Sequence, residues 1–382
     1  MNLENKINVL YICHAPDNLG GASLSLLNLI KSVKDNVNCI VILGKEGVVS
    51  QYFRDNGIEC IIANFPCNIR NRNFIVHIIT FPLKFLMHLV KSKLAILKVK
   101  RALCSRKIDI VHSNSSVFIF GDILSKKLNT KHVWHFREFQ DIDFNMKPFL
   151  GKYDLKKRMR RADVLIAITK AVYDHWHFDE YANSMYIWDA VRSEKDSVIQ
   201  INKEKYFLFC AALLSKAKGV DCALRAFGLS GMAKQGYKLK IIGVCKSETL
   251  KSELSGIAKY FDIEDSVEYL GYQANIKPYM EKATAFLMTS VNEGLGRVTV
   301  EAMFYGCLVI ARHSGGTLEF LKNGYNGLYF DNDEQLSKIL QMVSTKMPID
   351  IISNAQKFAI DNFSEEKYGE KIKKVYSEII TD

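Results

Sequence analysis

The sequence predicts an α/β protein of two domains, each built around a parallel β-sheet. Short, continuously apolar runs alternate with amphipathic segments along the whole chain, which is typical of buried parallel strands joined by helices. The runs form two series, and the polar stretch 188–205, which has no periodicity, separates them. A length of 382 residues, 48% of them hydrophobic, also favours two domains over one.

Strands are expected in both domains. Those of the first domain, residues 1–190, are 7–13, 38–43, 58–63, 108–113, 131–136 and 163–169. Those of the second domain, residues 191–363, are 205–213, 239–244, 266–271, 284–289 and 307–312. The last segment, 364–380, has Ser364 as a helix N-cap and glutamates in its first turn, so a terminal helix is expected there.

The chain is basic, with a formal net charge of +11 that is unevenly placed. Between Cys67 and Lys107 there are ten Lys or Arg residues and no Asp or Glu. A basic excess of this kind suits three classes of partner: nucleic acid, an anionic membrane surface or a phosphorylated ligand.

Part of this basic region has the pattern of an amphipathic helix. Pro82 can begin a helix, and one stripe after it is apolar. The stripe consists of Leu83, Leu86, Met87, Val90, Leu94 and Leu97. The adjoining face carries Lys84, His88, Lys91, Lys98 and Arg101. Two interpretations stay open: an interfacial helix on an anionic membrane, and a core helix with a solvated basic face.

The cysteines and the N-terminus indicate a cytoplasmic protein. None of the nine cysteines occurs as Cys-x-x-Cys, most lie in apolar runs, and their odd number argues against full pairing, so reduced thiols are expected. The first apolar run, 7–13, is too short for a signal peptide and fits a strand. No segment has eighteen uninterrupted apolar residues, so a spanning helix is not expected.

A pair of glycines, Gly20 and Gly21, follows the first strand and precedes a helical segment. Backbone N–H groups at such a helix start can bind phosphate, although a tight turn without a ligand fits equally well. The spacing is not Gly-x-Gly-x-x-Gly and no acidic residue clearly ends the second strand. Both observations argue against a nicotinamide-dependent dehydrogenase.

Three further turns follow strands of the second domain. The first has Lys218 beside Gly219, and the third is Gly-Gly-Thr at 315–317. The second has Glu293 in a glycine-rich turn, with Glu301 eight residues later. Lysine and free N–H groups suit phosphate, whereas carboxylates suit the hydroxyl groups of a sugar. Because the carboxyl ends of parallel strands meet at one edge of a sheet, the three turns are expected to converge on one ligand.

These motifs, taken in order, resemble the large group 1 family of retaining glycosyltransferases, which have the GT-B fold. The resemblance is carried by Gly-Gly-Ala at 20–22, Lys218-Gly219, the Glu-x7-Glu segment 293–303 and Ser-Gly-Gly-Thr at 314–317. The Glu-x7-Glu segment is the most specific of them. The resemblance covers almost the whole chain and implies two Rossmann-like domains facing a central cleft, with the C-terminal helix packing back towards the N-terminal domain.

The resemblance also implies roles for individual residues in a nucleotide-sugar site of the C-terminal domain. Glu301 would hold the ribose hydroxyls, Glu293 would meet the donor sugar, and Lys218 would neutralise the diphosphate. His135 would lie near the anomeric carbon, so His135 and Glu293 are the catalytic candidates. The other donor-binding candidates are Gly20, Gly21, Gly294, Leu295, Gly296, Gly315, Gly316 and Thr317.

The chain departs from the family pattern at one phosphate-binding position. Ala212-Leu213-Leu214 stands where the family often has Gly-Arg-Leu, and Lys216 or Arg297 are candidates to replace that arginine. No His or Asp cluster has metal-ligand spacing, so no metal and no other cofactor is expected. No residue is an evident nucleophile, so the retention that the resemblance implies favours attack on the face from which the diphosphate leaves.

The predicted function is transfer of a sugar from a nucleotide-diphosphate sugar, such as a UDP-sugar, to a glycan or lipid-linked acceptor in bacterial surface-polysaccharide synthesis. Lys84, Lys91, Lys98 and Arg101 are expected to form an acceptor or membrane face, which would make the protein peripheral on the inner leaflet.

Two alternatives belong to other classes. A nucleotide-sugar epimerase would use the same donor site without a basic acceptor face. A nucleic-acid-binding protein fits only the charge, because the basic segments lack interleaved aromatic residues and no helix-turn-helix is evident. Neither alternative explains Glu293 together with Glu301, so nucleic acid is not expected as a partner.

Overall fold

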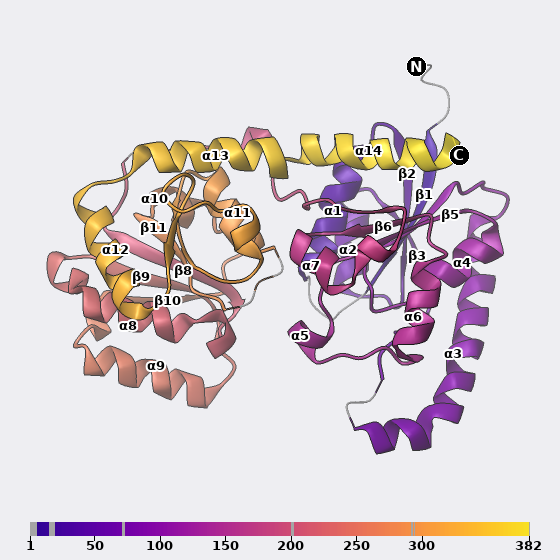
Figure 1. The fold of residues 1–382 in the computed structure, drawn as a ribbon, viewed down its shortest axis with the longest axis horizontal. Helices are drawn as coiled ribbons and strands as arrows, with labels where there is room; N and C mark the ends of the chain where they lie inside the picture. Colours follow the sequence, from indigo (N-terminus) through magenta and orange to yellow (C-terminus); the bar gives the residue numbers. More distant parts are fainter. Residues whose placement is uncertain are drawn as a thin grey trace. The chain divides into compact units, whose positions relative to one another are not determined.

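A computed structural model shows the chain folded around two parallel β-sheets, as the sequence predicts (Figure 1). Two units result: unit 1 consists of Met1–Ala190 and Glu365–Asp382, and unit 2 of Val191–Ser364. The residues that the structure describes are 6–14, 20–70, 73–199, 202–291, 293 and 295–381.

The sheet of unit 1 has the strand order β3-β2-β1-β4-β5-β6-β7. Its strands are β1 (Ile7–Cys13), β2 (Val37–Leu43), β3 (Glu59–Ile62), β4 (Ile110–Ser113), β5 (Lys131–Phe136), β6 (Val164–Ala167) and β7 (Ser184–Tyr186). Its helices are α1 (Gly21–Val33), α2 (Val48–Asp55), α3 (Phe74–Leu103), α4 (Phe120–Leu128), α5 (Asp141–Phe144), α6 (Gly151–Met159), α7 (Lys170–His175) and α14 (Glu365–Thr381). All strands predicted for the first domain are present, and the short edge strand β7 is an addition.

The two faces of this sheet are covered by different helices. Val9, Tyr11 and Cys13 of β1 belong to an apolar cluster with side chains of α1, α2 and α14. Leu10 and Ile12 point to the other face, where they belong to a cluster with α3 and α4. Burial on both faces is the reason why these strands are continuous apolar runs in the sequence.

The C-terminal helix α14 completes unit 1, which confirms the expectation that it packs back onto the first domain. It lies against α1, and a Cβ atom on Gly369 would collide with the carbonyl oxygen of Ser32, so glycine permits the close approach of the two helices. The hydroxyl of the buried Tyr376 lies 2.7 Å from Nδ1 of His112 and donates a hydrogen bond to the hydroxyl of Tyr11 at 3.1 Å. The helix is therefore tied to the sheet by polar as well as apolar contacts.

The sheet of unit 2 has the order β10-β9-β8-β11-β12-β13. Its strands are β8 (Tyr206–Leu213), β9 (Lys238–Val244), β10 (Val267–Gly271), β11 (Ala285–Met288), β12 (Leu308–Arg312) and β13 (Leu328–Phe330). Its helices are α8 (Val220–Ser230), α9 (Glu248–Tyr260), α10 (Lys277–Lys282), α11 (Arg297–Phe304), α12 (Asp333–Thr345) and α13 (Ile349–Phe363). All strands predicted for the second domain are present, and β13 is an addition. Apolar residues of α8, α9 and α12 form one core cluster with the sheet.

The helix α3 does not begin at Pro82, as the sequence suggested, but at Phe74. The side chain of Asn73 caps it by accepting hydrogen bonds from the N–H groups of Ile75 and Val76, at 3.0 and 3.3 Å. Pro82 lies inside the helix, where it has no N–H to donate, and Figure 1 shows α3 bent between its first turns and the rest.

Much of α3 is not covered by the rest of unit 1. The apolar stripe predicted from the sequence, Leu83 to Leu97, is between 43% and 65% exposed. The C-terminal half is anchored in the core through the buried Ala95, Val99 and Leu103, whereas the N-terminal half touches unit 1 mainly through aromatic contacts with Phe149. The interpretation of the stripe as part of a core is therefore wrong. By length and composition, α3 is also the one helix of the described residues that could cross a membrane. The sequence analysis did not expect such a helix, because lysines interrupt its apolar residues.

Candidate functional site

The three turns predicted in the second domain follow neighbouring strands of unit 2. The turns come after β8, β11 and β12, and these strands are adjacent in the sheet and parallel. Their carboxyl ends therefore lie together at one edge, as expected, and the contacts below show that the turns interlock.

The first turn is held closely against the end of β11. Gly219 has a left-handed backbone (φ +72°) and begins α8, and a Cβ atom there would collide with the carbonyl oxygen of Thr289. The hydroxyl of Thr289 donates to the carbonyl oxygens of Lys218 and Gly219, at 3.1 and 2.8 Å. Ser290 donates in the same way to Ala217, at 3.1 Å. The local conformation of the Lys218 turn is thus set by a neighbouring strand.

Two of the predicted ligand-binding side chains meet directly. Nζ of Lys218 donates to Oε1 of Glu293 at 2.5 Å, although the two residues lie on different turns. Both side chains are partly exposed, Lys218 by 38% and Glu293 by 19%. The third turn joins them, because the N–H of Gly316 donates to the carbonyl oxygen of Glu293 at 2.8 Å. A cation, a carboxylate and a glycine-rich backbone are therefore gathered at one place.

Glu301 lies on α11 and is 8% exposed. Its Oε1 lies 2.9 Å from Nη2 of Arg192, a residue of the polar stretch between the two series of strands. Burial disfavours the charged form of Arg192, but Glu301 and then Tyr305 outweigh it and hold the pKa of the guanidinium above its ordinary value. Sequence reasoning missed Arg192, because no local pattern links it to a glutamate so far along the chain.

The other predicted residues of unit 2 surround this group. Leu295 is buried, Gly296 begins α11 with φ +67°, and Thr317 is buried in the short helical turn Gly316–Glu319. Gly315 lies beside the backbone of Glu293, and Gly294 is outside the described residues. Two buried hydroxyl groups near these turns, Thr299 Oγ1 and Ser314 Oγ, have no hydrogen-bond partner among the described residues. Hydroxyl groups of this kind suit a ligand that supplies oxygen atoms.

The two candidates for the missing arginine have different surroundings. Nζ of Lys216 lies 2.8 Å from Oε1 of Glu253, on α9, and its side chain is 67% exposed. Arg297 is half-buried and is the first residue of α11, next to the Glu293 turn along the chain. The position of Arg297 favours it over Lys216 as the replacement.

In unit 1, the glycine pair lies at the start of α1. The carbonyl oxygen of Gly20 accepts hydrogen bonds from the N–H groups of Ser23 and Leu24, at 3.1 and 3.2 Å. Gly21 is the first residue of the helix, and no atom of the described residues would lie within 4 Å of a Cβ atom on either glycine.

His135 lies on β5 with its side chain wholly buried. Burial, and then the charge of Arg137, hold its pKa well below the ordinary value, so the ring is neutral at pH 7. Nε2 has no hydrogen-bond partner and lies 3.9 Å from Oδ1 of Asp189, which forms a buried ion pair with Arg137. The structure thus places His135 in a buried polar cluster with Arg137 and Asp189, which sequence reasoning did not identify.

The basic residues predicted on α3 occupy two environments. Lys84 and Lys91 are half-buried on the side of the helix that carries His88, whose ring stacks on Phe149 at 4.3 Å. Lys98 and Arg101 are exposed. Elsewhere, the nine cysteines are all free thiols, and among the described residues no group of three or more His, Cys, Asp or Glu could hold a metal ion.

Two models of known protein families match the chain. Residues 191–358 match the family model described as Glycosyl transferases group 1, and residues 19–183 match the one described as Glycosyltransferase Family 4. A glycosyltransferase of Methanocaldococcus jannaschii, itself uncharacterised, is 26% identical over 94% of this chain and 95% of its own.

Two further proteins are informative. A Campylobacter jejuni enzyme is 30% identical over 40% of each chain, and its name is N-acetylgalactosamine-N,N'-diacetylbacillosaminyl-diphospho-undecaprenol 4-alpha-N-acetylgalactosaminyltransferase. The crystal structure of Anabaena HepE in complex with UDP superposes with a TM-score of 0.77, covering 97% of this chain and all of that one, at 19% identity. The latter likeness concerns the fold.

Proposed function

The chain belongs to the group 1 glycosyltransferases and has their GT-B fold, and on this premise we propose that it transfers a sugar from a nucleotide-diphosphate sugar to a lipid-linked glycan, with retention of configuration. The observation that carries the proposal is the contact between Lys218 and Glu293. A diphosphate needs a cation and a sugar needs hydrogen-bond acceptors, and these two groups come from different turns to the same edge of the sheet.

The donor would be held along this edge. Lys218 neutralises the diphosphate, together with the N–H group of Thr317, and Glu293 accepts hydrogen bonds from the sugar. The N–H of Gly316, also predicted to bind phosphate, donates instead to the carbonyl oxygen of Glu293. Glu301 accepts hydrogen bonds from the ribose. Before the donor binds, Lys218 and Glu293 compensate each other's charge. When it binds, the diphosphate takes the place of Glu293 beside Lys218, and sugar hydroxyls take the place of Lys218 beside Glu293. Arg192 pairs with Glu301, and the two oxygen atoms of a carboxylate suit it to accept from two hydroxyl groups.

Transfer requires the bond between the anomeric carbon and the phosphate oxygen to break. Negative charge then grows on the leaving diphosphate, and Lys218 with the N–H group of Thr317 stabilises it without a metal ion. An acceptor hydroxyl attacks the anomeric carbon on the face from which the diphosphate departs, and its proton passes to a phosphate oxygen. The new bond has the configuration of the old one, so no enzyme nucleophile is needed.

His135 is proposed to act at the sugar end of the donor. Its Nε2 makes no hydrogen bond within the protein, so this atom has the capacity to bind a substrate hydroxyl. The ring is neutral and buried, so it must become accessible before it can contact a ligand. A His135→Ala protein should bind a nucleoside diphosphate normally and lose turnover, whereas a structural role would leave turnover largely intact in folded protein.

Titration calorimetry with UDP and other nucleoside diphosphates, in the presence of EDTA, tests the donor site. Lys218→Gln is expected to weaken binding at least tenfold. It should also raise the activation free energy of transfer by about 3 kcal/mol. Lys251→Gln is the matched control, because it removes the same charge from an exposed side chain of α9 that pairs with Glu248 instead. Equal effects of the two substitutions, or binding that appears only when a divalent metal is restored, would contradict the assignment.

The acceptor is proposed to be presented at a membrane surface, where α3 docks. The residues 74–90 expose apolar side chains on most sides, and exposed basic residues follow along the same helix. This segment is only roughly 25 Å long at 1.5 Å per residue, less than the ~30 Å of a hydrocarbon core. The remainder of α3 is anchored in unit 1 through Ala95, Val99 and Leu103. Length and anchoring therefore favour a helix that lies in the interface of an anionic membrane over one that spans it.

A further inference from the structure

A cavity of about 350 Å³ lies between the start of α3 and the segment 147–152, which leads into α6. Its two walls are joined by backbone hydrogen bonds, from the N–H of Arg70 to the carbonyl oxygen of Lys147 at 2.9 Å and from Phe149 to Asn68 at 3.1 Å. The side chain of Asn68 also accepts from the N–H of Leu150, at 3.3 Å. The cavity is therefore a formed feature of unit 1, and its volume falls within the range of ligand sites.

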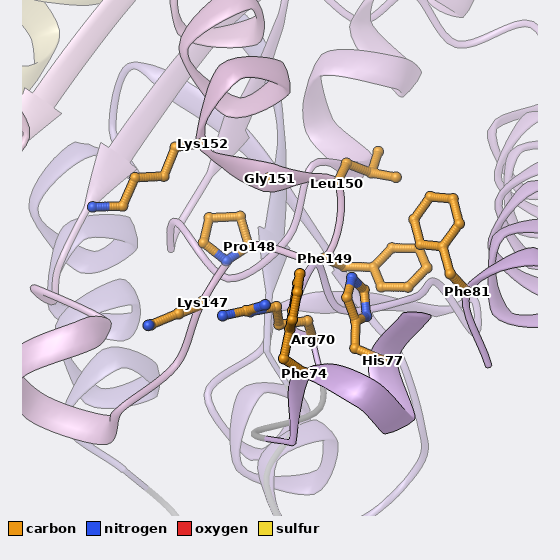
Figure 2. Close-up of a pocket in the computed structure, with 10 residues that line it drawn as sticks. All are labelled: Arg70, Phe74, His77, Phe81, Lys147, Pro148, Phe149, Leu150, Gly151 and Lys152. Atoms are coloured by element: carbon orange, nitrogen blue, oxygen red, sulfur yellow. The ribbon is translucent and has the colours of Figure 1, made fainter. Parts of the chain in front are cut away.

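One side of the cavity is cationic. Figure 2 shows the nitrogen-bearing ends of Arg70, Lys147 and Lys152 on the same side, and none of the described lining residues is acidic. Arg70 also lies over the ring of Phe74, at 5.1 Å from its centroid. A carboxylate outside the lining, Asp141, approaches Lys152 to 3.9 Å, which is too long for a strong pairing. The cavity thus offers an excess of two to three positive charges to a ligand.

The opposite side is aromatic. Phe81 stacks on Phe149 with ring centroids 5.1 Å apart, and His77 contacts both rings edge-on. His77 is 8% exposed, and its buried Nδ1 has no hydrogen-bond partner in the part of the chain that the structure describes. Burial, and then Arg70 and Lys84, lower the pKa of His77, so this nitrogen belongs to a neutral ring. His77 thus lines the aromatic side of the cavity with a neutral ring.

The aromatic side continues onto the exposed apolar face of α3. Phe74 lines the cavity and is 58% exposed, and Ile78, Ile79 and Leu83 follow it along the helix and are more than half exposed. The cationic side of the cavity, its aromatic side and the apolar face of α3 follow one another. A ligand that matches all three has an anionic head and a long hydrocarbon tail.

We propose that the cavity binds the diphosphate of a lipid-linked acceptor, whose hydrocarbon chain lies along the exposed face of α3. The inference deepens the proposed function and rests on its lipid-linked acceptor. Charge favours this occupant over an ordinary phospholipid, because a diphosphate diester carries two negative charges and a phosphatidyl group one, against the three cations of the cavity. The head would be held by Arg70 and Lys147 at a fixed place relative to α3.

Calorimetric titration with farnesyl diphosphate, in UDP-saturated protein, tests the cavity. The double substitution Arg70→Gln/Lys147→Gln is expected to weaken binding at least roughly tenfold, because two charge-assisted hydrogen bonds are lost. Lys93→Gln/Lys100→Gln removes the same charge from exposed positions of α3 and should change binding less than twofold. Inorganic diphosphate and farnesol, which carry head or tail alone, should each bind much more weakly than farnesyl diphosphate.

Several outcomes would overturn the inference. Equal losses in the two double variants would show general attraction between charges and no site. A loss of binding to phosphatidylglycerol vesicles as large as the loss of farnesyl diphosphate binding would assign the cavity to bulk phospholipid. Lys218→Gln should leave farnesyl diphosphate binding intact, and a loss there would place the ligand in the donor site. A protein that binds farnesyl diphosphate in the cavity but no nucleotide would keep this inference and refute the proposed function.

Discussion

At the scale of single residues, Glu301 is a buried carboxylate with a structural partner and a proposed role in binding the donor. Its partner Arg192 compensates its charge, so the ion pair alone accounts for a glutamate among apolar neighbours. Removal of one partner would leave the other charge half-buried and unpaired. For this reason Glu301→Gln, which keeps shape and some hydrogen-bonding capacity, is a sharper probe than alanine.

Glu301→Gln is expected to weaken UDP binding by about 1–3 kcal/mol, because a neutral amide accepts hydrogen bonds from ribose less strongly than a carboxylate. Calorimetry measures the affinity for UDP, and a melting curve measures the stability lost when Arg192 is left without its charged partner. Glu248→Gln, on the exposed start of α9, is the control and should leave both unchanged. Wild-type affinity in the Glu301 variant would remove this residue from the donor site.

Buried histidines give unit 1 a specific response to acid. Burial lowers the pKa of His132 to about 4, and it holds the pKa values of His112 and His135 well below the ordinary range. In the unfolded chain each would titrate near 6.5. The unfolded state therefore binds more protons below pH 6.5, and the stability present above that pH is lost as the pH falls.

The free energy of unfolding is expected to fall by up to about 1.4 kcal/mol per pH unit for each such histidine. The window is pH 6.5 down to 5, where ordinary carboxyl groups hardly titrate. Hydrogen exchange, corrected for intrinsic rates, should show the sheet of unit 1 losing protection across this window. Unit 2, whose one histidine is the exposed His313, is the internal control. Equal losses in the two units would mean that the buried histidines are not the cause.

At the scale of elements, α3 joins two parts with different roles. Its C-terminal half covers the sheet through Ala95, Val99 and Leu103, and its N-terminal half is exposed and lines the cavity. The bend at Pro82 separates the first turns from the remainder. An element of this kind can present an apolar surface to a membrane without a loss of packing in the unit that carries it.

Replacing Leu83, Leu86 and Leu94 with Gln should hardly change the melting temperature, because all three are more than half exposed. Binding to vesicles of anionic lipid should fall more than a hundredfold, since burial of each leucine contributes roughly 1.5 kcal/mol or more. Replacing Lys84, Lys91 and Lys98 with Gln should weaken binding to anionic vesicles by about 1 kcal/mol per charge, and should leave binding to neutral vesicles unchanged.

Vesicle co-sedimentation as a function of salt measures these effects, with Leu229→Gln on α8 as an exposed control in unit 2. Undiminished binding of the triple leucine variant, or no binding by the wild-type protein, would leave α3 without a membrane role. Resistance of the wild-type protein to extraction with carbonate would instead indicate that α3 spans the bilayer.

At the scale of the whole molecule, unit 1 is assembled from two ends of the chain. Its first 190 residues need α14, which follows the whole of unit 2 in the sequence. Five side chains of α14, those of Tyr368, Ile372, Val375, Tyr376 and Ile379, are buried in the core of unit 1. Unit 1 can therefore complete its fold only after the entire chain is available.

A protein that ends at Ser364 should fail to fold unit 1, because the lost burial, at roughly 1.5–3 kcal/mol per large side chain, is comparable with the whole stability of a domain. Hydrogen exchange should show an unprotected first sheet and a protected second sheet. Tyr376→Phe is a milder perturbation of the same contact. It should lower the free energy of unfolding by about 1–3 kcal/mol, because it leaves the buried Nδ1 of His112 unpaired. Tyr260→Phe, at an exposed position, should cost nothing. A truncated protein with unchanged protection in both sheets would refute the dependence.

The sequence by itself determined the class of fold, the strands, the turns that follow them and the family. These are local properties: parallel strands buried on both faces are continuous apolar runs, and turns at the carboxyl ends of neighbouring strands must meet at one edge. For the same reason the meeting of Lys218 with the Glu293 turn could be expected before any contact was known.

The tertiary structure alone decided which groups lie opposite one another across long separations. Periodicity identified an apolar stripe on α3, but only the packing of unit 1 shows that its described residues leave that stripe exposed. The partner of Glu301, the burial of His135 and the cavity beside Phe149 likewise depend on contacts between segments far apart in the chain. The start of α3 before Pro82 was missed because the Asn73 cap and the bend outweigh the usual preference of proline for the first helical turn.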